Sequence, residues 1–176
     1  MSARERRAFE FRAEDTGAEL PTLTGTVLPY GEKARIGRAF TEEFRAGSMD
    51  ATDVVANVQH DERLLLARTG GGLTLSDGPK AMEARLQLPD TQAGRDAAVL
   101  VRDGVLKGFS VEFVAMRDVW EGAHRIVQEA RMVGLALVPR PAYAGAVIAE
   151  GRSVDIEEWL AVERGRHARR RLWRSL

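Results

Sequence analysis

Residues 107–115, KGFSVEFVA, decide how the centre of the chain folds. Apolar residues alternate with polar or small ones through this stretch, so Phe109 and Phe113 point to one side. Ser110 and Glu112 point to the other side. Such a period of two is typical of a strand with one buried face. We therefore expect a strand that packs its phenylalanines into a core and turns Ser110 away from it, where a substrate could reach the hydroxyl.

A helix is predicted before this strand and a long strand after it. Asp90 or Thr91 can cap the helix, which runs through Asp103 and stops at Gly104. After a hairpin turn, residues 124–138 form an extended stretch that ends in an apolar run and is broken by two prolines. The chain is thus expected to pass from the helix into the serine strand and return along a second strand.

Short strands are predicted for most of the chain before the helix. Apolar alternation and turn-forming residues indicate them at residues 9–11, 22–30, 53–60, 64–68, 73–76 and 81–88. Residues 37–48 instead favour a short helix or an irregular loop, because Phe40 and Phe44 lie four apart and Gly47 follows. Many short strands and few helices indicate an α+β fold, with a largely antiparallel β-barrel or rolled sheet and peripheral helices.

Length and composition predict one domain with a tail. The chain has 176 residues, of which 44% are hydrophobic, enough for one domain with a substantial core. We assign residues 1–150 to this domain and residues 151–176 to a helical, basic C-terminal tail. The sequence has no cysteine, no signal-peptide pattern and no apolar run of the ~20 residues that a membrane helix needs. We therefore expect a soluble, intracellular protein with no membrane partner.

The net charge of zero hides a strongly basic tail. Residues 161–176 hold six arginines and one glutamate, so they carry +5 and the preceding residues carry −5. Such a tail can contact its own acidic domain, an acidic partner or nucleic acid. A solvated helical face explains the same charges, and the sequence leaves these alternatives open. Nucleic acid is a candidate partner only through this tail.

His60 and Ser110 are the residues best suited to chemistry. Serine is a poor nucleophile until a base within hydrogen-bond reach removes its proton, and histidine is the commonest such base. The two residues are 50 positions apart, so only folding could bring them together. Each also has a structural interpretation, His60 as a buried and satisfied histidine and Ser110 as a packing residue. No metal-ligand spacing or phosphate-binding loop accompanies them, so we expect no cofactor.

An ordered set of segments carries a resemblance to a known enzyme family. The segments are Leu23–Val27 with Tyr30, Gln59–Asp61, Gly72–Leu73, Leu88–Thr91, Gly94–Asp96, Gly104, Gly108–Phe113 and Leu137–Tyr143. In this order and spacing they resemble the prohead maturation proteases of tailed bacteriophages with HK97-type capsids, which are related in fold to the herpesvirus assemblins. The similarity covers residues 9–149, nearly all of the expected domain.

The resemblance implies a serine endopeptidase with a herpesvirus-protease-like fold. In such an enzyme Ser110 is the nucleophile and His60 the general base, and peptide bonds are cleaved through an acyl-enzyme. The implied substrates are scaffold or the scaffold-like segment of the major capsid protein, and the enzyme itself. The implied location is the inside of the immature capsid in the cytoplasm of a bacterial host. The resemblance also leaves self-association open.

The third catalytic residue departs from the family pattern. The family places an acid or histidine on the strand after the serine strand, and many relatives have glutamate where this chain has Gly134. Glycine cannot orient a histidine. We prefer Glu129 for this role, with His124, Asp61 or a dyad assisted by water or backbone as alternatives. The same departure supports a competing hypothesis, a catalytically inactive relative that acts as an internal scaffold or capsid-assembly factor.

A serine protease also needs an oxyanion hole. By resemblance, the backbone of residues 138–140 supplies it, and because Pro139 has no N–H, the donor would be Val138 or Arg140. A chain corner formed by two prolines is the structural interpretation of the same segment.

Overall fold

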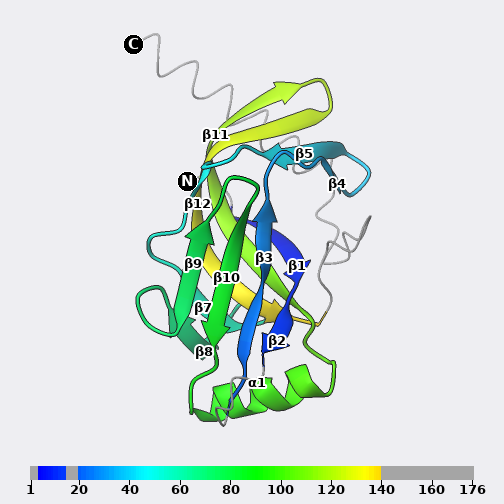
Figure 1. The fold of residues 1–176 in the computed structure, drawn as a ribbon. Coiled ribbons are helices and arrows are strands. Elements are labelled where there is room, and N and C mark those ends of the chain that lie inside the picture. Colours follow the sequence, from blue (N-terminus) through cyan, green and yellow to red (C-terminus); the bar gives the residue numbers. More distant parts are fainter. Residues whose placement is uncertain (1–3, 15–19, 140–176) are drawn as a thin grey trace.

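The computed structural model describes residues 4–14 and 20–139, which form two β-sheets and one helix (Figure 1). In chain order the elements are β1 (Arg4–Glu10), β2 (Arg12–Glu14), β3 (Thr22–Pro29), β4 (Ala34–Ile36), β5 (Phe40–Phe44), β6 (Met49–Asp50), β7 (Val55–Val58), β8 (Asp61–Arg68), β9 (Leu73–Asp77), β10 (Ala81–Gln87), α1 (Gln92–Arg102), β11 (Gly108–Glu121) and β12 (His124–Val138). The predicted basic tail lies outside the described residues.

Strand β12 is the centre of the larger sheet. It pairs antiparallel with β11 on one side, and parallel with β5, β6 and β7 in turn on the other. Strand β1 pairs antiparallel with β11, and β8 pairs antiparallel with β7. The smaller sheet has the order β2-β3-β10-β9 and is antiparallel throughout. The strand that carries Ser110 and the strand that leads to His60 therefore flank β12 from opposite sides.

The two sheets pack against each other around one apolar core. Phe109 and Phe113 of β11 are fully buried, as their alternation predicted. Leu23 of β3 and Leu86 of β10 belong to the same cluster from the smaller sheet. Full burial of side chains of this kind stabilises the fold by roughly 1.5–3 kcal/mol each. The core thus determines which face of β11 is turned inward and leaves its other face for Ser110.

Helix α1 begins and ends where the sequence predicts. The side-chain oxygen of Thr91, the N-cap, accepts a hydrogen bond from the N–H of Gly94 at 3.2 Å. Gly94 has no room for a side chain, because a Cβ there would overlap the carbonyl oxygen of Pro89. Gly104, at φ +70°, ends the helix in the left-handed conformation. No helix in the described part of the chain is long and apolar enough to cross a membrane.

The predicted strand-rich α+β fold is confirmed, but the closed barrel and the prediction for residues 37–48 are wrong. The described strands form two sheets and no closed barrel, because no hydrogen-bonded ladder joins one sheet to the other. Most strand pairs are antiparallel, as predicted, although β12 also has parallel neighbours. The described residues contain one helix, and the other predicted helix, in the tail, lies outside them. Within residues 37–48, Phe40–Phe44 forms β5 instead of the predicted helix or irregular loop, because pairing with β12 outweighs the helical spacing of its phenylalanines.

Candidate active site

Ser110 lies on the face of β11 that points away from the core. Its neighbours Phe109 and Val111 are fully buried in the core, and Ser110 itself lies directly across from Ala136 of β12. Ser110 is only 4% exposed, less than its position on the outer face predicted. The imidazole of His60 stands against its hydroxyl and contributes to this burial.

His60 comes from the two-residue turn that joins β7 to β8. Gln59 and His60 have φ values of +53° and +59°, and Val58 pairs with Asp61 across the turn. Two successive positive φ values are typical of a type I′ hairpin, which usually contains Asn and Gly. For other residues this conformation costs about 1–3 kcal/mol each. The turn is tied to β12, because the N–H of Gln59 donates to the carbonyl of Leu137 at 2.9 Å.

The imidazole of His60 reaches across β12 to the hydroxyl of Ser110. Nε2 and Oγ are 2.8 Å apart, and the His60 side chain is 8% exposed. Ala136, which lies between β7 and β11 in the row that contains Ser110, is small enough to leave space for this contact. A base in hydrogen-bond contact with a serine hydroxyl is the arrangement that activates the serine as a nucleophile.

A carboxylate that the sequence analysis did not assign lies behind His60. Oε2 of Glu112 is 3.4 Å from Nδ1 of His60, and the Glu112 side chain is 12% exposed. The buried Nδ1 forms no hydrogen bond with any other described residue. The distance of 3.4 Å is longer than a formed N–H···O bond, but such contacts in unliganded active sites often tighten when substrate binds. Glu112 follows Ser110 by two residues on the same strand face, so the alternation that located the serine could have located this acid too.

Gly134 leaves room for this carboxylate. It lies directly across from Glu112 on β12, beside a bulge where Val133 has no partner on β11. A Cβ at position 134 would lie 3.5 Å from Oε2 of Glu112. The resemblance implies an acidic side chain at position 134 of β12. In this chain Glu112 of β11 places its carboxylate in the space that such a side chain would enter.

Burial lowers the pKa of His60. Desolvation disfavours the imidazolium, the positive charge of Arg6 lowers the pKa further, and the Glu112 carboxylate opposes both by raising it. A pKa below the ordinary value of 6.5 keeps Nε2 free to accept a proton in more acidic solution. This is the protonation state that a general base requires.

Glu129, the residue preferred from sequence for the third position, lies far along β12 from this site. Its carboxylate pairs with Arg117 at 2.5 Å, and its side chain is 59% exposed. Glu129 and Ala136, the residue across from Ser110, are seven positions apart on the strand, which corresponds to roughly 23 Å. Glu129 is therefore too distant to orient His60.

The two alternatives to Glu129 are also engaged elsewhere. Nδ1 of His124 is 2.9 Å from the hydroxyl of Thr41, and its Nε2 is 3.2 Å from a carboxylate oxygen of Glu43. The Asp61 carboxylate accepts hydrogen bonds from Arg63, which lowers the pKa of Asp61 to about 2. Neither side chain forms a hydrogen bond with His60 in the described structure.

Two further groups lie near His60 and Ser110. Of the two residues expected to supply the oxyanion hole, Val138 lies across from Gly108, and its carbonyl accepts a hydrogen bond from the N–H of Lys107 at 3.0 Å. The other, Arg140, lies outside the described residues.

Asn57 of β7 shares a cross-strand row with Ala136 and Ser110 and is 8% exposed. Its Oδ1 has no hydrogen-bond partner among the described residues, and buried polar atoms are usually paired. Sequence reasoning gave no signal for Asn57.

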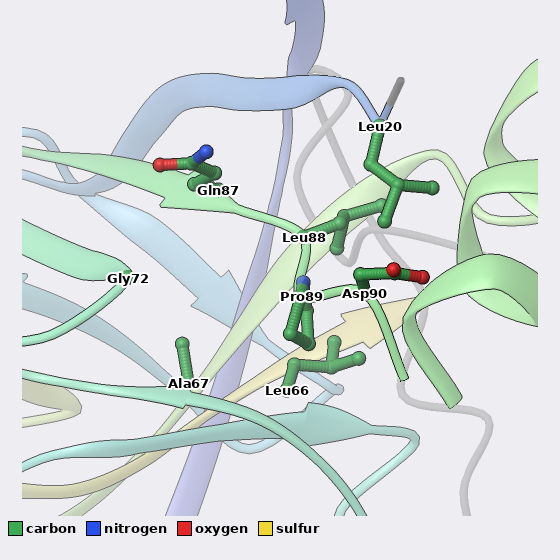
Figure 2. Close-up of a pocket in the computed structure, with 8 residues that line it drawn as sticks. All are labelled: Leu20, Leu66, Ala67, Gly72, Gln87, Leu88, Pro89 and Asp90. Carbon is green, nitrogen blue, oxygen red and sulfur yellow. The ribbon is translucent and has the colours of Figure 1, made fainter. Parts of the chain in front are cut away.

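A separate cavity of about 440 Å³ lies between β8, the start of β9, the end of β10 and the segment before α1 (Figure 2). Its apolar lining includes Leu20, Leu66, Leu88 and Pro89, and the polar residues Gln87 and Asp90 also line it. Neither Ser110 nor His60 lines it.

Among the described residues, no three His, Asp or Glu side chains are grouped as metal ligands.

Comparisons with known proteins identify the family of the chain and a solved structure with a similar fold. The model of the caudovirus prohead serine protease family matches residues 7–159. No curated protein gives a significant match. Among solved structures, the capsid assembly protease gp21 of bacteriophage T4 is similar, with a TM-score of 0.55 and 13% identity over 78% of this chain and 98% of that chain. At this identity the likeness shows a shared fold. Because the family match spans most of its length, the chain belongs to the caudovirus prohead serine protease family.

Proposed function

We propose that the protein is a serine endopeptidase that works inside an immature phage capsid, with Ser110 as nucleophile and His60 as general base. The observation that carries this proposal is the 2.8 Å contact between Nε2 of His60 and Oγ of Ser110, two residues that are 50 positions apart. The family supports the same chemistry, since its description is that of a prohead serine protease.

The reaction follows from this contact. Oγ of Ser110 attacks the carbonyl carbon of the scissile peptide bond while Nε2 of His60 takes the hydroxyl proton. The C–N bond then breaks, His60 returns the proton to the leaving amine, and an ester to Ser110 remains. Water attacks this ester and gives its proton to His60, the acid product leaves, and Ser110 regains its hydrogen. The lowered pKa of His60 keeps the imidazole neutral at the start of this cycle.

Glu112 replaces Glu129 in our proposal as the residue that orients His60. Its carboxylate lies 3.4 Å from Nδ1, on the side of the ring opposite to Ser110. An acid in this position holds the tautomer with the proton on Nδ1 and stabilises the imidazolium that forms during attack. Glu112 touches no reacting atom, so its role is to position the base.

Backbone N–H groups near the end of β12 are our proposal for the oxyanion hole. Val138 lies across from Gly108, two positions along the strand from the Ser110 pair. The N–H of Val138 would then be close to the carbonyl that Ser110 attacks, and Arg140, outside the described residues, stays the other candidate by resemblance. One such donor typically contributes about 3–4 kcal/mol to catalysis.

The proposed substrates are scaffold, or the scaffold-like segment of the major capsid protein, and the enzyme itself. The support is the family, whose members are prohead proteases, and the solved relative, a capsid assembly protease. The competing hypothesis of an inactive assembly factor was based on the missing acid at Gly134. The Glu112 carboxylate in the same space counts against that argument, because an acid is present beside His60.

Co-expression with the major capsid protein that it is proposed to cleave tests the proposal. Wild type should shorten the capsid protein, and Ser110→Ala and His60→Ala should leave it intact, with cleavage followed by mass spectrometry. Thr41→Ala is a matched control, because it removes a hydroxyl that also contacts a histidine, His124. Cleavage that persists in Ser110→Ala would show that Ser110 is not the nucleophile, and assembly without any cleavage would support the inactive relative.

A further inference from the structure

The N-terminal strand β1 lies against the strand that carries Ser110. In its antiparallel pairing with β11, Ala8 is directly across from Ser110 and Arg6 directly across from Glu112. Residues that face each other in this way share a face of the sheet. Alternate residues of β1 therefore belong to the catalytic face, and the residues between them point to the opposite face.

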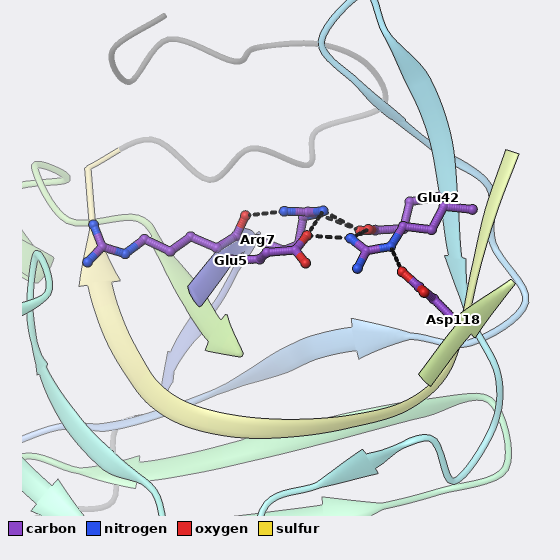
Figure 3. Close-up of polar contacts among 6 residues, drawn as sticks. Glu5, Arg7, Glu42 and Asp118 are labelled. Atoms are coloured by element: carbon purple, nitrogen blue, oxygen red, sulfur yellow. Dashed lines mark hydrogen bonds and ion pairs between the residues drawn. The ribbon is translucent and has the colours of Figure 1, made fainter. Parts of the chain in front are cut away.

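The inward face of β1 is anchored by a buried group of charges (Figure 3). Arg7 donates to Glu42 at 2.6 Å, and Arg125 donates to the other oxygen of Glu42 at 3.0 Å and to Asp118 at 2.7 Å. Glu5 pairs with both arginines. The Glu42 side chain is fully buried, and those of Arg7 and Arg125 are less than 10% exposed. Losing one partner of such a pair leaves an uncompensated buried charge, so this group holds β1 in register.

Arg7 also restrains the residue before it. One of its terminal nitrogens donates to the backbone carbonyl of Arg6 at 2.7 Å. The backbone of Arg6 is thus held both by pairing with β11 and by a side chain from the anchored face.

The catalytic face of β1 delivers two arginines to the carboxylate behind His60. Nη2 of Arg6 is 3.5 Å from Oε1 of Glu112, and Nη1 of Arg4 is 3.8 Å from the same oxygen. The other oxygen, Oε2, faces Nδ1 of His60. The arginines of β1 therefore contact one oxygen of the Glu112 carboxylate, and the other oxygen faces the imidazole of His60.

Charged groups from two other strands act on His60. Glu112 comes from β11 and raises the pKa of the imidazole, and Arg6 comes from β1 and lowers it. On β8, Asp61 follows His60 in sequence, but its carboxylate is bound to Arg63. The charge of the imidazole is thus set mainly by its burial and by the balance between Arg6 and Glu112.

We propose that Arg6 is a positioning residue of the catalytic site, which holds the Glu112 carboxylate in place for His60 and makes the docked strand β1 part of the active enzyme. This inference rests on the proposed protease function. Arg6 is 55% exposed, so its ion pair contributes little to the stability of the fold. Arg6 instead acts on the position of the Glu112 carboxylate and, through that carboxylate, on His60.

The test compares Arg6→Gln and Arg6→Lys with Arg117→Gln. Arg117 is a matched control, because it is equally exposed and pairs with a glutamate, Glu129, on the same sheet but far from His60. Arg6→Gln should lower kcat by about fivefold. It should also move the acid limb of the kcat/KM profile to higher pH, because removal of a cation favours the imidazolium. Arg6→Lys keeps the charge and should leave the acid limb at its wild-type pH.

A second measurement does not need activity. In the Ser110→Ala background, NMR titration of His60 should show a higher pKa in Arg6→Gln and an unchanged pKa in Arg117→Gln. The opposite shift is expected for Glu112→Gln, which removes an anion. Identical titrations in Arg6→Gln and Arg117→Gln would overturn the inference. A wild-type enzyme with no Ser110-dependent cleavage would instead refute the proposed function, and the titration would still report on Arg6.

Discussion

Moving the acid from Glu112 to position 134 tests how a carboxylate reaches His60. Glu112→Ala removes the carboxylate and keeps a Cβ in the strand. Loss of the acid that orients a catalytic histidine can cost about 10⁴ in rate. We expect about 10²–10³ here, because the 3.4 Å contact with Nδ1 is longer than a formed hydrogen bond in the free enzyme. The assay is kcat/KM for cleavage of a peptide that spans the capsid-protein cleavage site.

Gly134→Glu supplies a carboxylate at the position where the family resemblance implies one. A Cβ at 134 would lie 3.5 Å from Oε2 and 3.7 Å from Cβ of Glu112, which is ordinary contact, and Gly134 does not have a positive φ. In the single variant, two carboxylates would share this space. At about 4 Å and an effective dielectric constant of about 20, they repel each other by about 4 kcal/mol. We expect this variant to lose both stability and activity.

The double variant Glu112→Ala/Gly134→Glu removes that repulsion and leaves one carboxylate beside His60. Its kcat/KM should exceed that of Glu112→Ala at least tenfold, and its melting temperature should exceed that of Gly134→Glu. Glu129→Gln is the control and should stay within about twofold of wild type. If the double variant folds but is no more active than Glu112→Ala, the reasoning that a carboxylate above Gly134 orients His60 is refuted.

Glu42→Gln should lower the free energy of unfolding by about 3 kcal/mol in urea titrations at pH 7, because two buried arginines lose their shared counter-charge. A loss below about 1 kcal/mol would contradict this. Gln59→Asn should raise the same free energy by about 0.5 kcal/mol, since asparagine tolerates a φ of +53° better than glutamine does; a decrease would count against strain in this turn. The kcat/KM profile should have its acid midpoint below pH 6.5, because burial and Arg6 lower the pKa of His60. A midpoint above pH 6.5 would be inconsistent with a buried, neutral imidazole.

Elements whose signals lie within a few residues could be predicted from the sequence. The strand over residues 124–138 has the predicted bounds, and α1 begins after the predicted cap, Thr91. Caps, turns and strand alternation depend on neighbours in the chain, so a short window contains the information.

Elements that depend on distant partners could not be predicted in this way. Phe40–Phe44 is a strand because it pairs with residues 124–127 of β12, more than 80 positions later. The bulge at Val133, which lies beside Gly134, likewise depends on how β12 meets β11. Strand formation is decided largely by such contacts rather than by intrinsic preference.

For the candidate catalytic site, the sequence by itself determined which side chains are available and that Ser110 and Glu112 share one face of their strand. That property is local, because successive side chains of a strand alternate. Only the tertiary structure decided that His60 reaches Ser110 and that Glu112, rather than Glu129, lies behind it. These distances depend on the register of three strands, β7, β12 and β11, and on the hairpin turn that carries His60 across β12. No window of the sequence contains all of these contacts, and for this reason the glycine at 134 suggested a missing acid where the fold supplies one from the neighbouring strand.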